Sequence, residues 1–277
     1  MTEHEKVFFS ILRSALWGTP VEVPEGFTQW SAVMKLAKIQ ALMGLVGDVL
    51  LTRSEIRETL PTKFVVRLQE IPMTSVGMHS QMNMTLQLIV TNLRNHGVEP
   101  VLLKGQGLAR NYPTPELRQC GDIDLYVGVQ NYAKSYEILK NIVSEIDEQS
   151  CLDSDEKHYH ASVGNIMIEV HRYADIHSSS TFNQIYQEYA HIGLSEGLIP
   201  IQFGDMVVNT PADNFNAFYV FNHMWHHFMH GGVGLRQLCD WSVFLHSRAG
   251  SLDLDYLSSL LSKMKLMKPW KVFGCIA

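Results

Sequence analysis

Residues 157–173, KHYHASVGNIMIEVHRY, contain two runs in which polar and apolar residues alternate, one on each side of Gly164-Asn165. A period of two is the pattern of a β-strand with one buried face, and a two-residue turn containing glycine joins two such strands into a hairpin. With that turn, Val163 pairs with Ile166, and the residues further from the turn pair so that the two residue numbers always sum to 329. The segment is therefore predicted to be an antiparallel hairpin of known register.

This register predicts one polar and one apolar face. His160 is expected opposite Glu169 and His158 opposite His171, all on one face with Met167. Glu169 is the single carboxylate of the apolar run IMIEV, so it is expected either to pair with a histidine or to bind a cation. The other face is suited to packing on helices and carries Tyr159, Ala161, Val163, Ile166, Ile168 and Val170.

A second strand is predicted over 122–127, where DIDLYV alternates acidic and apolar residues. Residues two apart share a face of a strand, so Asp122 and Asp124 project together. Adjacent carboxylates repel each other, and they are tolerated when solvated, when one is protonated, or when a cation lies between them. Their oxygen ligands suit Mg²⁺ or Mn²⁺. This pair is the first candidate for a metal site, with a solvated strand end as the alternative.

Upstream, VEPVLL (98–103) is a candidate buried strand that leads into Lys104, Gly105, Gln106 and Gly107. A glycine turn between a strand and a helical turn can present backbone N–H groups and the lysine ammonium to phosphates. Arg118 lies in the following loop (113–121). It is expected either to donate two hydrogen bonds to a phosphate or to be a surface charge.

Most of the remaining chain is expected to be helical. One or two long helices are predicted over 54–96, broken near Pro61 and Pro72, and the sequence from Thr210 to Asp213 is typical of a helix start with proline in the first turn. We predict three regions: a helical one over 1–97, a catalytic core over 98–210 and a helical one over 211–277. Further helices are predicted over 3–17, 28–51, 131–146, 211–230, 235–248 and 254–267.

The composition excludes several classes of protein. Lys plus Arg total 22 against 28 for Asp plus Glu, and the net charge of −6 offers no general attraction to extended nucleic acid. The four cysteines form no CxxC pair, which favours a reducing cytoplasm over a disulfide framework or zinc ribbon. No segment is typical of a signal peptide or membrane span, so no membrane partner is expected. The apolar end of the sequence raises the expectation that the chain is truncated.

A second group of histidines occurs at 223, 226, 227 and 230, a spacing that puts three of them on one helix face. The neighbours Phe221, Trp225 and Phe228 favour a packed aromatic helix whose histidines form local hydrogen bonds. A zinc site completed by Asp240 or Asp213 is the less favoured alternative, because HxxHH lacks the glutamate of HExxH. A third possibility is that His223 and His227 face the nucleotide site.

Together, LLKGQGLARNYPTPELRQCGDIDLYV and the later IEVH resemble the nucleotidyltransferase superfamily, in particular a bacterial group described as uncharacterised nucleotidyltransferases. The resemblance extends more loosely to HMWHHF, GLRQL and CDW, which contain His223, His227, Arg236 and Asp240. It departs from the superfamily's usual Gly-Ser or Gly-Gly turn, because Gln106 follows Gly105. It implies an α+β fold, in which a small mixed sheet is flanked by helices and by N-terminal and C-terminal helical regions.

The resemblance also implies a reaction. Asp122 and Asp124 would hold two divalent ions, Mg²⁺ or Mn²⁺, while Glu169 would bind one of them and help to activate an acceptor hydroxyl. The triphosphate would lie against Lys104 to Gly107 and Arg118, with His158, His160 and His171 beside Glu169. The implied activity is transfer of a nucleoside monophosphate group from a nucleoside triphosphate to a hydroxyl of a small molecule or protein, with release of pyrophosphate. A non-catalytic relative that binds nucleotide or a partner, and a histidine-dependent metallohydrolase, are the alternatives.

Overall fold

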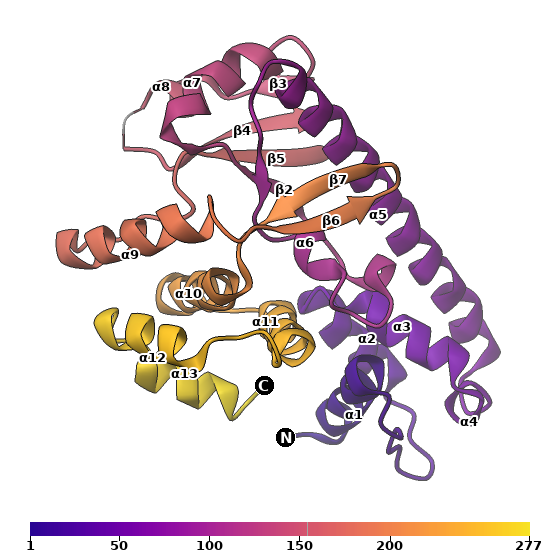
Figure 1. Cartoon of the computed structure of the whole chain (residues 1–277). Coiled ribbons are helices and arrows are strands. Elements are labelled where there is room, and N and C mark those ends of the chain that lie inside the picture. Colours follow the sequence, from indigo (N-terminus) through magenta and orange to yellow (C-terminus); the bar gives the residue numbers. More distant parts are fainter. Residues whose placement is uncertain (154) are drawn as a thin grey trace.

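A computed structural model of the chain describes residues 1–153 and 155–277. Its centre is a mixed sheet of seven strands in the order β3-β4-β5-β2-β1-β7-β6, with helices packed around it (Figure 1). The predicted α+β architecture is thus confirmed. The strands are β1 (Val101–Leu102), β2 (Asp122–Tyr126), β3 (Glu145–Ile146), β4 (His158–Val163), β5 (Ile166–His171), β6 (Ile199–Phe203) and β7 (Met206–Thr210).

The hairpin β4–β5 has the register predicted from the sequence, with Val163 opposite Ile166, His160 opposite Glu169 and His158 opposite His171. Gly164 takes a φ of +58° in the turn, a conformation that glycine adopts without steric cost. The predicted apolar face is buried, with Tyr159, Ile168 and Val170 each fully inaccessible. One face of the hairpin therefore belongs to the core.

Strand β2 lies beside β5 in parallel, and this pairing joins the two polar faces. Asp124 is the direct neighbour of Glu169, and Asp122 that of Met167. Strand β1 then pairs antiparallel with β2. All three carboxylates consequently project from the same side of the sheet.

Several boundaries differ from the sequence-based predictions. The helix expected over 131–146 ends at Leu139, because Glu145 and Ile146 pair with β4 as an edge strand. The strand expected over 98–103 is only two residues long. The helix expected to start at Pro211 starts at Asp213, since Thr210 still pairs in β7. The hairpin β6–β7 and the helix α9 (Ser180–Gly193) were not predicted at all.

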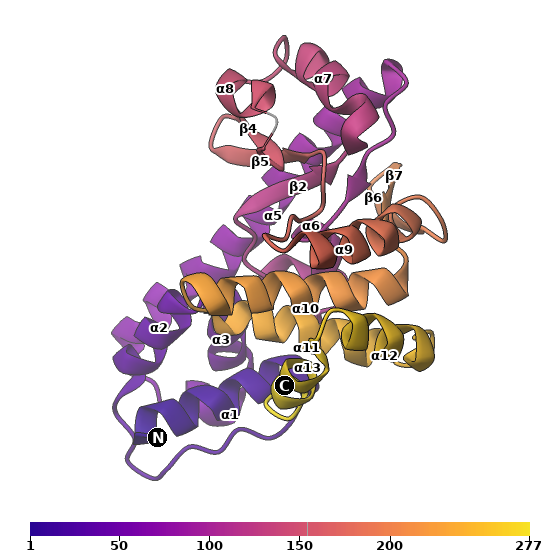
Figure 2. The same ribbon diagram turned by 90° about the vertical axis from the view of Figure 1, so that its left-hand side faces the viewer.

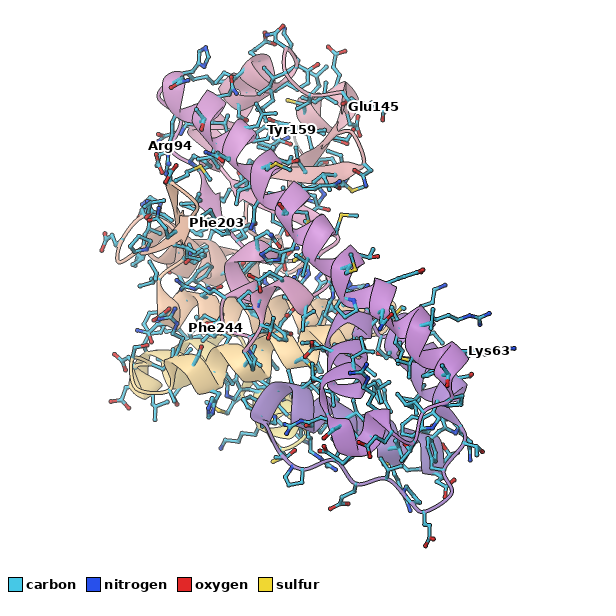
Figure 3. All side chains as sticks on the ribbon, turned by 90° about the vertical axis from the view of Figure 1, so that its right-hand side faces the viewer. Lys63, Arg94, Glu145, Tyr159, Phe203 and Phe244 are labelled. Carbon is cyan, nitrogen blue, oxygen red and sulfur yellow. The ribbon has the colours of Figure 1, made fainter. Side chains whose placement is uncertain are left out.

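Helix α5 (Thr62–Asn95) runs from the N-terminal helices to the sheet, as Figure 3 shows between the labelled Lys63 and Arg94. A break at Pro61 was expected and is present, but the break expected at Pro72 is not. Proline removes one hydrogen bond from a helix, and here packing on both sides of Pro72 keeps the helix continuous. The N-terminal half packs on α3 and the C-terminal half on the sheet.

The other N-terminal helices are α1 (Glu3–Trp17), α2 (Trp30–Ile39), α3 (Met43–Thr52) and α4 (Ser54–Arg57). Helix α1, expected over 3–17, begins at a capping box formed by Thr2 and Glu5 and is followed by Gly18 in the left-handed conformation. The single helix expected over 28–51 is divided into α2 and α3, because Ala41 adopts a φ of +53° between them.

The C-terminal helices are α10 (Asp213–His230), α11 (Leu235–Arg248), α12 (Leu254–Lys263) and α13 (Met267–Gly274). Figure 2 shows α10 lying between the sheet and the other three. Three phenylalanine side chains of α10, Phe215, Phe218 and Phe221, are fully buried against α9, α11 and α13. The shorter elements between strands are α6 (Gln106–Ala109), η1 (Pro115–Leu117), α7 (Gly128–Leu139) and α8 (Glu148–Leu152). Within the described part of the chain, no helix combines the length and apolar character needed to cross a bilayer.

Candidate functional site

Three carboxylates converge on the sheet face opposite α5. Asp122, Asp124 and Glu169 each offer one oxygen, and these three oxygens all lie within 4.8 Å of one another. The convergence follows from the strand register, which places Asp124 beside Glu169 and Asp122 two residues earlier on the same face. The three residues predicted from separate segments of the sequence are therefore brought together by the fold.

Asp124 is the most deeply buried of the three, with 1% of its surface exposed. Its Oδ1 lies 2.9 Å from Lys104 Nζ and 3.1 Å from His171 Nε2. Burial favours the neutral acid, but the charge of Lys104 and the hydrogen bond from His171 outweigh it and hold the pKa of Asp124 below its ordinary value. Asp124 is an anion despite its burial.

Glu169 lies among three histidines. Its Oε2 is 3.3 Å from His171 Nε2, and its Oε1 is 3.5 Å from His160 Nε2 and 3.8 Å from His158 Nε2. Burial acts against ionisation, yet the hydrogen bond from His171 and the charge of Lys104 bring the pKa of Glu169 far below its ordinary range. The predicted position of the histidines beside Glu169 is confirmed.

Asp122 behaves differently. Burial, reinforced by the charge of Asp124, raises the pKa of Asp122 above its ordinary value. The charge of Lys104 lowers the pKa of Asp122 but does not offset these two effects.

The residues present fit a divalent metal ion. Oδ2 of Asp124 is buried and has no hydrogen-bond partner among the described residues, which leaves a carboxylate oxygen available to a ligand. All three donors are carboxylate oxygens, the ligands that Mg²⁺ and Mn²⁺ prefer.

A cavity of about 350 Å³ opens over the carboxylates, between the sheet and the helices α10 and α11. His223 and His227 of α10 lie in its wall, with His223 Nε2 3.4 Å from Lys104 Nζ and 3.1 Å from His227 Nε2. The orientation of these two histidines toward the site had been left open by the sequence. The lining comprises Lys104, Gly105, Leu108, Arg118, Asp122, Asp124, Lys157, His158, Glu169, Val220, His223, Met224, His227, Arg236, Gln237 and Asp240.

The family comparison agrees with this geometry. The sequence pattern of a family described as "Uncharacterised nucleotidyltransferase" matches residues 27–275. The chain belongs to this family. A search of curated proteins found no match.

The solved structures that this nucleotidyltransferase family member is similar to share little sequence with it. A crystal structure of ANT(2")-Ia in complex with adenylyl-2"-tobramycin is 8% identical, with a TM-score of 0.47 over 67% of this chain and 97% of that one. A solution structure of ANT(2")-Ia is 7% identical, with a TM-score of 0.45 over 70% and 95%. An antigenic nucleotidyltransferase-like protein from Paracoccidioides brasiliensis is 12% identical, with a TM-score of 0.41 over 68% and 88%.

The glycine turn of this family member divides into two parts. Lys104 and Gly105 line the cavity, and Gly105 has a φ of +52° with the carbonyl oxygen of Asp122 3.1 Å from the position that a Cβ would take. Gln106 is 2% exposed and its amide donates to Asn83 Oδ1. Gly107 faces Thr210, outside the cavity lining. The structure thus brings the first two residues of the turn to the carboxylates, and not the Gln106 side chain.

Arg118 is 5% exposed, so the surface-charge alternative is wrong. Its Nε and Nη2 donate to the two oxygens of Asp240, each at 2.7 Å, and Tyr112 donates to the same Asp240 carboxylate at 2.7 Å. Arg236, the other α11 residue singled out from the sequence, lines the cavity and donates to the backbone oxygen of Gln119. Arg118 and Asp240 thus satisfy each other at the edge of the cavity.

The remaining histidines of α10 point elsewhere. His226 and His230 are exposed and stack on each other, with ring centroids 4.3 Å apart. Among the described residues, the groups suited to metal binding do not include any histidine of α10. The local contacts expected for these histidines are present, since His230 Nδ1 lies 2.8 Å from the carbonyl oxygen of His226.

Sequence reasoning missed Lys157 and Gln237, which also line the cavity. Lys157 pairs with Asp175 at 3.3 Å, and Asp175 accepts a hydrogen bond from Asn222 of α10. Lys157 directly precedes the hairpin strand that contains His158, and this position was the only sequence signal that could have identified it.

Proposed function

We propose that this protein transfers a nucleoside monophosphate group from a nucleoside triphosphate to a hydroxyl of a small molecule or a protein, with release of pyrophosphate. The observation that carries the proposal is the convergence of Asp122, Asp124 and Glu169 under a cavity that also holds the ammonium of Lys104. Membership of the nucleotidyltransferase family supports the reaction class.

In this proposal the three carboxylates hold Mg²⁺ or Mn²⁺. Bound there, the ions would neutralise phosphate charge and bring the attacking and leaving oxygens into line. The chain itself contributes positioning. Lys104 binds the triphosphate, Gly105 allows its close approach, and His171 orients Asp124 and Glu169 through contacts of 3.1 and 3.3 Å. The bond between the acceptor oxygen and the α-phosphorus forms as the bond to pyrophosphate breaks, and the hydroxyl proton passes, with the help of Glu169, to solvent water.

We propose residues 98–210 as the catalytic core, with the flanking region 211–277 closing the site. The support is that α10 and α11 supply a wall of the cavity, including His223, His227 and Arg236. Because these side chains face the carboxylates across the cavity, they are placed to contact a bound nucleotide or acceptor.

The test is a screen of radiolabelled nucleoside triphosphates with Mn²⁺ or Mg²⁺, scored for pyrophosphate release and for label transfer to added hydroxyl compounds or to the protein. Asp122→Asn and Asp124→Asn should each abolish turnover, because each removes a charged metal ligand while nearly preserving side-chain volume. Asp205→Asn is the matched control, since Asp205 is exposed in the β6–β7 turn. Equal activity in all four proteins would exclude the proposed site.

A binding measurement separates an enzyme from a non-catalytic relative. A ligand that binds only the native state raises the melting temperature. We expect Mg²⁺ with a nucleoside triphosphate to raise it in the wild type and not in Asp124→Asn. Stabilisation without pyrophosphate release under any acceptor would identify a nucleotide-binding protein without transferase activity.

A further inference from the structure

The polar face of the hairpin carries three histidines that are potential metal ligands in addition to the carboxylate of Glu169. His158, His160 and His171 each direct Nε2 toward Glu169, at distances of 3.3 to 3.8 Å from its two oxygens. One donor atom each from His158, Glu169 and His171 forms a second group in which all atoms lie within 4.8 Å of one another. The transfer reaction proposed above uses these histidines only to orient carboxylates.

We propose that His158, Glu169 and His171 form a second metal site, separate in ligand type from the carboxylate site, that binds Zn²⁺. Imidazole nitrogen with one carboxylate is a ligand set that zinc prefers, whereas Mg²⁺ prefers oxygen alone. The two sites meet at Glu169, which is the only residue common to both groups.

The spacing of the donor atoms approaches that of a zinc centre. Bonds of about 2.1 Å arranged as a tetrahedron place neighbouring ligand atoms roughly 3.4 Å apart. Oε2 of Glu169 lies 3.3 Å from His171 Nε2 and its Oε1 lies 3.8 Å from His158 Nε2, and one donor atom from each of the three residues lies within 4.8 Å of the others. The three side chains must therefore draw closer together around a bound ion.

The backbone holds the ligands in place without an ion. His158 and His171 are direct cross-strand partners, and Glu169 lies two residues before His171 on the same face. The site is therefore built on two paired strands and not on a loop.

His160 lies on the solvent side of the proposed site and provides a route of entry. Its Nε2 lies 3.5 Å from Glu169 Oε1, and 45% of its side chain is exposed, against 14% for His158 and 1% for His171. An ion can thus reach the site from solvent by way of His160, while His158 and Glu169 also border the cavity.

The outer contacts make the bound ion exchangeable. Ligating histidines usually donate their second ring N–H to a carboxylate or carbonyl group, and loss of that contact weakens metal binding by roughly 10- to 100-fold. The Nδ1 atoms of both His158 and His171 are buried without a hydrogen-bond partner among the described residues. We therefore expect zinc that a chelator removes readily, unlike the permanent ion of a structural site.

The experiment is a titration of the chelator-treated full chain with Co²⁺, the spectroscopic substitute for Zn²⁺, followed by visible absorption and then by displacement with Zn²⁺. With excess Mg²⁺ present to occupy the carboxylate site, the wild type should bind one equivalent of Co²⁺ at the histidine site with an intense four-coordinate spectrum. His158→Gln should weaken binding by roughly 10-fold or more, and His160→Gln by a smaller factor. His226→Gln, in the exposed pair on α10, is the matched control and should bind like the wild type.

Asp122→Asn distinguishes this proposal from the proposed transferase activity. It removes an oxygen ligand of the carboxylate site alone, so it should abolish turnover and keep the Co²⁺ spectrum. Loss of the spectrum in Asp122→Asn with retention in His158→Gln would overturn the histidine site, as would a six-coordinate spectrum in the wild type. If circular dichroism shows that His158→Gln does not fold, His158→Asn and His160→Gln are compared with Asp122→Asn in its place.

Discussion

Arg118 and Asp240, which lie 122 positions apart in the chain, form a buried, bidentate ion pair. Arg118 lies in the loop before β2 and Asp240 in α11, so the pair connects the strand that carries Asp122 and Asp124 to the C-terminal helices. Burial disfavours the charged form of Arg118. The negative charge of Asp240 outweighs the effect of burial and raises the pKa of Arg118 well above its ordinary value. The pair thus holds together two walls of the cavity.

Asp240→Asn should destabilise the protein by about 3–5 kcal/mol. It leaves the Arg118 guanidinium buried without a charged partner, and breaking one side of a buried ion pair costs that much. Urea unfolding followed by circular dichroism measures the change.

The control for this variant is Glu99→Gln, which breaks the exposed pair between Arg94 and Glu99. A solvated ion pair is worth about 1 kcal/mol or less, so this variant should unfold close to the wild type. Equal losses in Asp240→Asn and Glu99→Gln would mean that the buried pair contributes no more than a surface pair.

The same pair shows where sequence reasoning stops. Local pattern identified Arg118 as a charged residue shortly before Asp122, but burial and a partner on α11 depend on packing between distant segments. The hairpin was predictable to the residue, because a period of two and a glycine turn determine register locally. That register, with the alternation in β2, was enough to place Glu169 and His171 on one polar face.

Lys104→Met should destabilise the metal-free protein by roughly 3 kcal/mol, because Asp122, Asp124 and Glu169 then repel each other without a compensating ammonium. Burial opposes the charge of Lys104, but attraction to Asp124 and Asp122 outweighs it and raises the pKa of Lys104. Since Mg²⁺ can take over the compensating role, it should raise the melting temperature more in Lys104→Met than in the wild type.

Differential scanning fluorimetry with EDTA and then with Mg²⁺ measures both effects of the lysine substitution. Lys63→Met, at an exposed position near the start of α5, is the matched control. An identical Mg²⁺ response in Lys104→Met and the wild type would show that the ammonium does not offset the charge of the carboxylates.

Gly44→Ala should destabilise the protein by about 1–3 kcal/mol through overpacking. A Cβ on Gly44 would lie 2.3 Å from the carbonyl oxygen of Leu117, in the backbone just before Arg118. Backbone cannot yield as a flexible side chain does, so α3 must shift. Gly250→Ala has open space around its Cβ and should be neutral, and chemical unfolding of the two variants compares them.

Two parts of the fold were missed although they carry local signals. Helix α9 follows the N-cap Ser179 and has apolar residues at helical spacing, among them Tyr186 and Ala190. Hairpin β6–β7 turns at Gly204-Asp205, a glycine-containing two-residue turn. At Pro72 a local rule instead predicted a break that is absent from α5, and there the packing between distant segments decided the outcome.

His171→Gln should reduce transferase turnover by roughly 10- to 100-fold and raise the Mg²⁺ concentration needed for half-maximal rate. His171 Nε2 lies between Asp124 and Glu169, at 3.1 and 3.3 Å, and glutamine cannot contact both oxygens from one position. Losses of that size are typical when a residue that orients metal ligands is removed. Steady-state rates over a Mg²⁺ series measure both parameters, with the exposed His226→Gln as the control. A lower rate at saturating Mg²⁺ with an unchanged half-saturation point would assign His171 a role in the reaction itself and not in orienting Asp124 and Glu169.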